Sequence, residues 1–263
     1  MATSFPYLLD TILALSALHL ASVETNHRHF WIDAAMKYQG QACSGLGRVL
    51  QEITPQHYGP AFVSSVFIML YATGFPVISS DDHAMDPIMK VTEVRTLISG
   101  SAMLFDRLNE TGREGDIHDW LCVPDTEESL ANKERNGNIM QSLGRTRTII
   151  DTTESSNKLV YRSTWQLLQH TIEPWPKIGI HGGVIAWPLF ISDEYLAVLR
   201  DGDWVARILF LHYAVAMRLV GNRWYVRDWG RRLVLATLEP LEEIPSMWTD
   251  TISWMRTGLD IDV

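Results

Sequence analysis

The stretch from Trp204 to Val220 constrains the fold most, because its 17 residues are apolar on nearly every face. Only Arg207, His212 and Arg218 interrupt it. A helix that is apolar all round must be enclosed by other helices or by lipid. The stretch is shorter than the roughly 20 residues of a membrane span, and it carries three ionisable groups. It therefore predicts the buried central helix of a soluble helical domain, with a lone histidine on it.

Apolar residues recur at helical spacing along most of the chain, while strand signals are scarce. The sequence predicts an all-α fold: a single helical domain over residues 1–263 with an internal apolar pocket. The expected helices cover Ser4–Ser22, Arg28–Glu52, Tyr58–Thr73, Pro87–Leu108, Ser156–Ile172, Asp193–Leu199, Trp204–Val220, Trp224–Leu238 and Met247–Arg256. The third is expected to end at Gly74-Phe75-Pro76, since glycine and proline punctuate helices.

Residues 109–157 form the most polar stretch and contain several glycines. We expect two short helical patches there at most, within a loop or lid; the alternative is a variable surface excursion. The glycine-rich Gly179–Gly183 is similarly expected to form a hinge or tight turn rather than an anion site.

Net charge and cysteine usage narrow the partners and the compartment. The chain has 22 basic and 31 acidic residues, a net charge of −9, which opposes direct binding to nucleic acid. Its two cysteines cannot build a disulfide framework, which favours a reducing compartment. No basic leader opens the chain, and no apolar run is expected to approach the roughly 20 residues of a membrane span. These features predict an intracellular protein, cytoplasmic or nuclear, and they leave a monomer and a homodimer both open.

Motifs of metal binding and catalysis are missing from the sequence. It has no Cys-x-x-Cys or His-Glu-x-x-His pattern, no Gly-x-Ser-x-Gly elbow and no complete dinucleotide fingerprint. We therefore expect neither a metal site nor a cofactor.

Several longer motifs carry a family resemblance. They are FPYLLDTILALSALHLA (Phe5–Ala21), WPLFISDEYLAVLRDG (Trp187–Gly202), HYAV (His212–Val215) and RWYVRDWGRRLV (Arg223–Val234). Their order resembles the C-terminal domain of fungal zinc-cluster transcription regulators of the sterol-uptake type. The resemblance implies an all-helical effector domain with a pocket for an apolar ligand, a sterol in the best-known members. The zinc cluster of that family is not in this chain, and Asp203-Trp204 replaces the His-Pro that usually precedes the central helix, so a sterol does not follow directly.

Aromatic and methionine side chains on inward helix faces are the candidates for the pocket wall, because they suit a flat polycyclic molecule. They are Phe67, Tyr71, Met103, Trp165, Trp187, His212 and Trp229. For each tryptophan the alternative is core filling, and for His212 it is a histidine whose hydrogen bonds are satisfied inside the core.

Two functions fit this pattern. The first is a free-standing relative of the regulator domains that binds a hydrophobic, polycyclic molecule such as a sterol, terpenoid or polyketide. The second is a secondary-metabolite enzyme that uses the same pocket for cofactor-independent cyclisation or isomerisation, in which His212 and Asp106 are the candidate polar groups.

Overall fold

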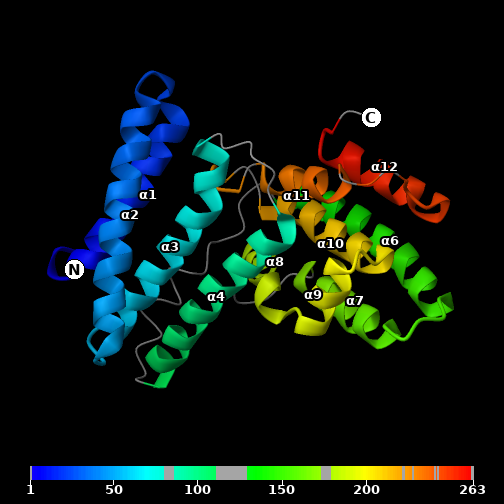
Figure 1. The fold of residues 1–263 in the computed structure, drawn as a ribbon, viewed down its shortest axis with the longest axis horizontal. Helices are drawn as coiled ribbons and strands as arrows, with labels where there is room; N and C mark the ends of the chain where they lie inside the picture. The colour runs from blue at the N-terminus through cyan, green and yellow to red at the C-terminus, as the bar shows by residue number, and fades with distance from the viewer. Residues whose placement is uncertain are drawn as a thin grey trace. The chain divides into compact units, whose positions relative to one another are not determined.

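The computed structural model describes residues 2–79, 86–110, 129–172, 179–220, 223–226, 228–239, 241 and 243–261. These residues fold into helices and turns without any strand, so the all-α prediction is confirmed for the part of the chain described. The contacts between Cα atoms divide the chain into two compact units (Figure 1). Unit 1 comprises Met1–Asp82 and Glu93–Leu121, and unit 2 comprises His83–Thr92 and Cys122–Val263.

Unit 1 is built on a helical hairpin. Its elements are α1 (Pro6–Val23), α2 (Arg28–Gln51), α3 (Tyr58–Ser79) and most of α4 (Pro87–Glu110), with 3-10 turns at Ala2–Ser4 and Thr25–His27. Helix α1 packs against both α2 and α3. Pro6 occupies the first turn of α1, where its missing N–H costs no hydrogen bond.

The core of unit 1 joins all four helices. Leu8 of α1, Leu46 of α2, Phe62 of α3 and Leu104 of α4 are among its buried members. Thr11 of α1 is the polar exception: its hydroxyl donates to backbone carbonyls of its own helix and lies 3.2 Å from the Ser64 hydroxyl of α3. A buried hydroxyl pair of this kind satisfies both groups and fixes how α1 and α3 are aligned.

Helix α3 continues past the predicted stop at Gly74-Phe75-Pro76 and ends at Ser79. Tyr71 and Phe75 stack one turn apart, with ring centroids 5.4 Å apart, and so link the turns on either side of Gly74. Arg28 at the start of α2 donates a hydrogen bond to the Ile78 carbonyl in the last turn. These contacts offset the one helical hydrogen bond that Pro76 removes.

Two helices of unit 1, α1 and α3, are long and apolar enough to cross a membrane by length and composition alone. The expectation that no apolar run reaches span length is therefore wrong for these two. A core helix of a globular protein passes the same test, and half of the apolar window of α3 is buried within the protein.

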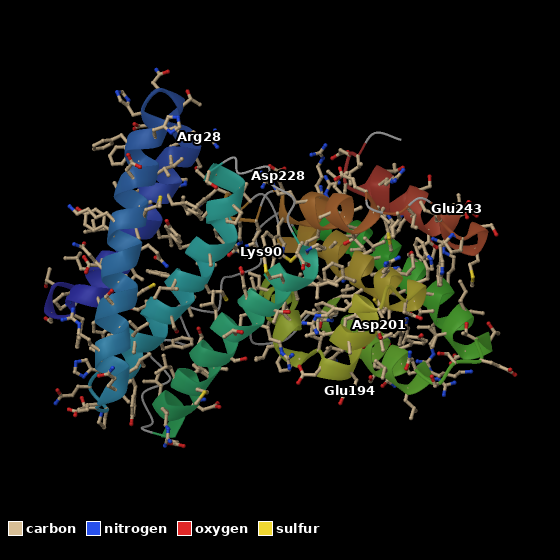
Figure 2. All side chains as sticks on the ribbon, in the orientation of Figure 1. Arg28, Lys90, Glu194, Asp201, Asp228 and Glu243 are labelled. Carbon is tan, nitrogen blue, oxygen red and sulfur yellow. The ribbon has the colours of Figure 1, made fainter. Side chains whose placement is uncertain are left out.

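Unit 2 surrounds one central helix. It contains α6 (Ser129–Thr152), α7 (Lys158–Ile172), α8 (Gly179–Phe190), α9 (Asp193–Arg200), α10 (Trp204–Ala216), α11 (Trp229–Leu238) and α12 (Thr249–Gly258), with 3-10 turns at Met217–Val220 and Ser246–Trp248. Helix α10 contacts α6, α7, α9, α11 and α12, and its residues from Ile208 to Ala216 are buried, as predicted. Its N-terminus is capped by Asp203, whose carboxylate accepts from the Ala206 N–H at 2.9 Å. Charged side chains stay outside: Glu194 and Asp201 are exposed at the two ends of α9 (Figure 2).

The long helix α6 corrects the expectation of short patches in residues 109–157. Its inward face alternates aliphatic and hydroxyl residues: Ile139, Ser142, Leu143, Thr146 and Ile150 are all at most 2% exposed. Because serine and threonine count as polar residues, the helical periodicity of this face is weak in the sequence, and the segment was predicted to be a polar loop. Residues 111–128 of the same stretch lie outside the described part of the chain.

Helix α8 likewise replaces the turn expected at Gly179–Gly183. Val184 and Trp187 follow these glycines at helical spacing, and both are completely buried. Packing of this face outweighs the weak helix propensity of glycine, a common outcome where tertiary contacts are available.

Candidate functional site

The seven residues expected to line the pocket divide between the two units. Phe67, Tyr71 and Met103 belong to unit 1, and Trp165, Trp187, His212 and Trp229 belong to unit 2. Each group is therefore considered within its own unit.

In unit 1 the expected residues have different environments. Phe67 is partly buried on α3, while Tyr71 is 7% exposed and stacks on Phe75. Burial, together with the nearby Cys43, raises the pKa of Tyr71 to about 12. Met103 is 71% exposed on α4, and Asp106, named for the enzyme alternative, is exposed on the same helix.

In unit 2 two of the expected tryptophans, Trp187 and Trp229, lie near the same residue, Tyr213. Trp187 stacks on Tyr213 with a centroid separation of 4.3 Å, and Tyr195 contacts the edge of Trp187 at 6.0 Å. Burial raises the pKa of Tyr213, and the Trp229 side chain acts in the opposite direction. The indole N–H of Trp187 is buried and makes no hydrogen bond with the residues that the structure describes. Trp165 is bonded elsewhere, since its N–H donates to the Leu143 carbonyl at 2.8 Å.

His212 is completely buried on α10, and both of its ring nitrogens are engaged. Nδ1 lies 2.7 Å from the Ile208 carbonyl and Nε2 lies 3.0 Å from the Ser142 hydroxyl. A carbonyl only accepts, so Nδ1 carries the proton and Nε2 accepts from Ser142. Burial lowers the pKa of His212 to about 4, and the nearby Arg145 acts in the same direction. The ring is neutral near pH 7, and its hydrogen-bonding capacity is used within the fold.

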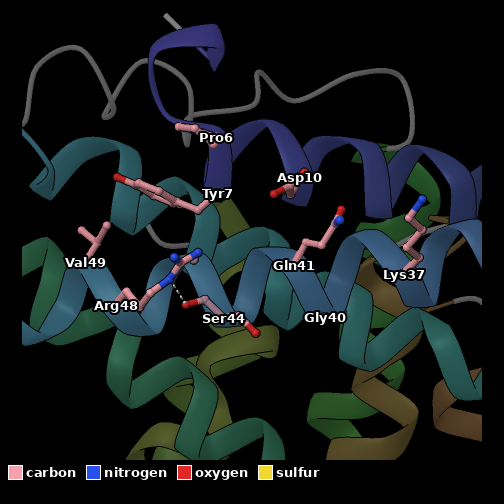
Figure 3. A pocket seen from close by; sticks show the side chains of 10 residues that line it. Pro6, Tyr7, Asp10, Lys37, Gly40, Gln41, Ser44, Arg48 and Val49 are labelled. Atoms are coloured by element: carbon pink, nitrogen blue, oxygen red, sulfur yellow. Dashed lines mark hydrogen bonds between the residues drawn. The ribbon is translucent and has the colours of Figure 1, made fainter.

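The structure places an open groove in unit 1, along the seam between α1 and α2 (Figure 3). Its volume is about 920 Å³. Residues of α1 form one side and a stripe of α2, one or two residues per turn, forms the other. The lining consists of Pro6, Tyr7, Asp10, Lys37, Gly40, Gln41, Ser44, Gly45, Arg48 and Val49.

Tyr7 is the central aromatic group of this groove. It is 5% exposed, its ring packs near Phe5 and His57, and burial raises its pKa to about 12. Its hydroxyl is buried and has no hydrogen-bond partner within the described ranges of the chain. Opposite it, a Cβ added to Gly45 would lie 2.9 Å from the Tyr7 Cβ, so glycine is needed for the close approach of α1 and α2.

None of the seven expected residues lines the groove. A sequence signal that could have found it is the glycine set of α2, Gly40, Gly45 and Gly47, because glycines within a helix permit close packing. The two glycines have different roles. Gly45 allows the close approach of α1 and α2, whereas a Cβ at Gly40 would meet nothing within 4 Å, so Gly40 leaves space open in the groove.

Metal ligands do not gather anywhere in the part of the chain that the structure describes. No group of three or more histidine, cysteine, aspartate or glutamate side chains is placed there to hold an ion.

One family model matches the N-terminal part of the chain. Residues 1–106 match the model of the fungal specific transcription factor domain, a match that contains α1, α2, α3 and most of α4, and hence the groove. Searches of characterised proteins and of solved structures found no significant match. The family match agrees with the resemblance to fungal regulators without assigning the sterol-uptake subtype. Residues 1–106 of this chain are therefore similar to the fungal specific transcription factor domain.

Proposed function

We propose that the chain is a regulator-type effector domain that binds a hydrophobic small molecule of the sterol, terpenoid or polyketide class in the α1/α2 groove. The groove carries this proposal: it lies within the residues that match the regulator family, and its volume of about 920 Å³ falls within the range of small-molecule sites. The family also supports an intracellular or nuclear place of action.

The lining suits a ligand with a flat apolar body. Pro6, the Tyr7 ring and Val49 supply apolar surface, and the alkyl stems of Lys37 and Arg48 extend it while their charges remain in water. Apolar contact of this kind contributes about 25 cal/mol for each Å² removed from water, against the cost of immobilising the ligand.

Binding fits the geometry better than the cyclase alternative. Both ring nitrogens of His212 are occupied by Ile208 and Ser142, and Asp106 is exposed on α4. A general acid or a charge-stabilising donor must reach the reacting atoms, and these two groups are committed or solvated.

Two glycines of α2 provide a matched test. A Cβ at either Gly40 or Gly47 meets nothing within 4 Å, and both positions are exposed, but only Gly40 lines the groove. Gly40→Phe should occupy groove volume and weaken ligand binding at least about tenfold, whereas Gly47→Phe should leave it unchanged. Both variants gain similar helix propensity, so their thermal stabilities should agree.

The measurement is isothermal titration calorimetry with a panel of sterols, terpenoids and aromatic polyketides. Equal affinities of the two variants for a bound ligand would place binding outside the groove. If no member of the panel binds the wild-type protein at 100 µM, the proposed function is wrong.

A further inference from the structure

We propose that the ligand of the α1/α2 groove is an anionic amphiphile whose acidic group pairs with Arg48. This inference rests on the proposed function and adds the chemistry of the ligand's polar end. It is carried by the position of Arg48 and by the charge of the groove lining.

Arg48 points its guanidinium into the seam between the two helices (Figure 3). Its Nε donates to the Ser44 carbonyl of the same helix at 3.3 Å, which orients the planar group. No carboxylate in the described part of the chain forms an ion pair with it. The terminal nitrogens of an oriented guanidinium form a fork that matches the two oxygens of a carboxylate, or two oxygens of a phosphate or sulfate.

The charges of the lining favour an anionic head group over a neutral one. Arg48 and Lys37 supply two positive charges and Asp10 supplies one negative charge, so the lining has a net charge of +1 in a chain of −9. Lys37 and Asp10 lie farther along the seam, so Arg48 is the charged side chain at the Tyr7 end (Figure 3). An acidic group at Arg48 therefore meets a cation, while the ligand's apolar body extends along the seam.

Tyr7 lies at the same end of the groove as Arg48 (Figure 3). Its hydroxyl is buried and has no hydrogen-bond partner among the residues that the structure describes, so it does not face a ligand in the open groove. The ring lines the groove and gives the apolar body of the ligand a contact next to its acidic group.

The test uses two ligands of equal chain length, dodecanoate and dodecanol, on the whole chain at low salt. Wild-type protein should bind dodecanoate about 5- to 10-fold more tightly, because one charge-assisted pair in an open groove is worth only a modest factor. Arg48→Gln should remove this preference, because it lowers the affinity for dodecanoate more than the affinity for dodecanol, to which Arg48 offers only its alkyl stem. Arg107→Gln removes the same charge from the exposed face of α4, outside the groove, and should keep the preference. Added salt at about 0.5 M should shrink the preference in the wild type, because the groove is open to solvent.

The outcomes separate this inference from the function on which it rests. If both ligands bind wild type equally, or if Arg48→Gln keeps the preference for the acid, the groove binds apolar molecules but the acidic head group is wrong. If Arg107→Gln loses the preference as fully as Arg48→Gln, the effect comes from overall charge and the role of Arg48 is refuted. If neither dodecanoate, dodecanol nor the earlier panel binds, the proposed function fails first.

Discussion

Replacing His212 by glutamine should abolish a large pH dependence of stability. In the folded protein the pKa of His212 is about 4, against an ordinary value of 6.5. Between these two pH values the unfolded chain binds a proton that the folded chain excludes, so stability falls as pH falls. The contribution is fully present above about pH 7 and is lost progressively down to about pH 4.

The size of the effect follows from the two pKa values. At pH 5 the unfolded imidazole is almost fully protonated and the folded one is about one-tenth protonated, which costs roughly 2 kcal/mol relative to pH 8. Glutamine retains a donor and an acceptor for Ile208 and Ser142 but does not titrate. His212→Gln should therefore be less stable than wild type at pH 8 by about 1–3 kcal/mol, and that difference should shrink by about 2 kcal/mol at pH 5.

The assay is urea unfolding followed by tryptophan fluorescence at pH 5, 6, 7 and 8. Other titrating groups affect wild type and variant alike, so the difference between the two isolates His212. His29→Gln, at an exposed position of α2, serves as the control for replacing a histidine by glutamine. A wild-type-minus-variant difference that stays constant from pH 8 to pH 5 would refute the enclosed, neutral state of His212.

Two further predictions concern packing and capping in unit 2. A Cβ at Gly230 would lie 2.2 Å from a backbone carbonyl oxygen of α10, so Gly230→Ala should lower the unfolding free energy by about 1–3 kcal/mol. Gly144→Ala, with open space around its Cβ, should raise the unfolding free energy by roughly 0.5–1 kcal/mol. Thermal unfolding followed by circular dichroism compares the two variants, and an unchanged stability of Gly230→Ala would contradict the close α10–α11 contact. Asp203→Ala removes the cap of α10 and the acceptor of the Tyr161 hydroxyl, and should cost about 1–2 kcal/mol. The same measurement on Asp201→Ala, an exposed neighbour, should show less than about 0.5 kcal/mol of change, and equal losses in both variants would contradict the capping role.

The sequence predicted those parts of the fold that depend on hydrophobic pattern. The enclosed helix α10 follows directly from residues that are apolar on every face, and its cap at Asp203 agrees with the predicted start. Helix α6 was missed because its inward face uses Ser142 and Thr146, whose hydroxyls are satisfied by His212 and by a backbone carbonyl only after folding. A face with hydroxyl side chains can be buried only when their hydrogen bonds are satisfied, and the hydrophobic pattern of a sequence does not show which groups will satisfy them.

The candidate site was harder to predict, for a different physical reason. A groove is a space that side chains do not fill, and Gly40 contributes to this one because it has no side chain. Sequence reasoning selected large aromatic residues, and two of these, Trp187 and Trp229, are completely or almost completely buried around Tyr213. Large apolar side chains fill cores more often than they line open grooves. The useful signal was the combination of small residues on α2 with Tyr7 and Arg48 at one end.

The contact between Gly45 and Tyr7 has a consequence for how the groove can change shape. Because a Cβ at position 45 would press on the Tyr7 Cβ at 2.9 Å, this position limits the spacing of α1 and α2, while polar side chains of the lining come from other positions of α2, such as Gln41, Ser44 and Arg48. Width and chemistry of the groove are thus encoded by separate residues. A single change of Gly45 to alanine would push the two helices apart and widen the groove, while the polar side chains that line it would stay the same.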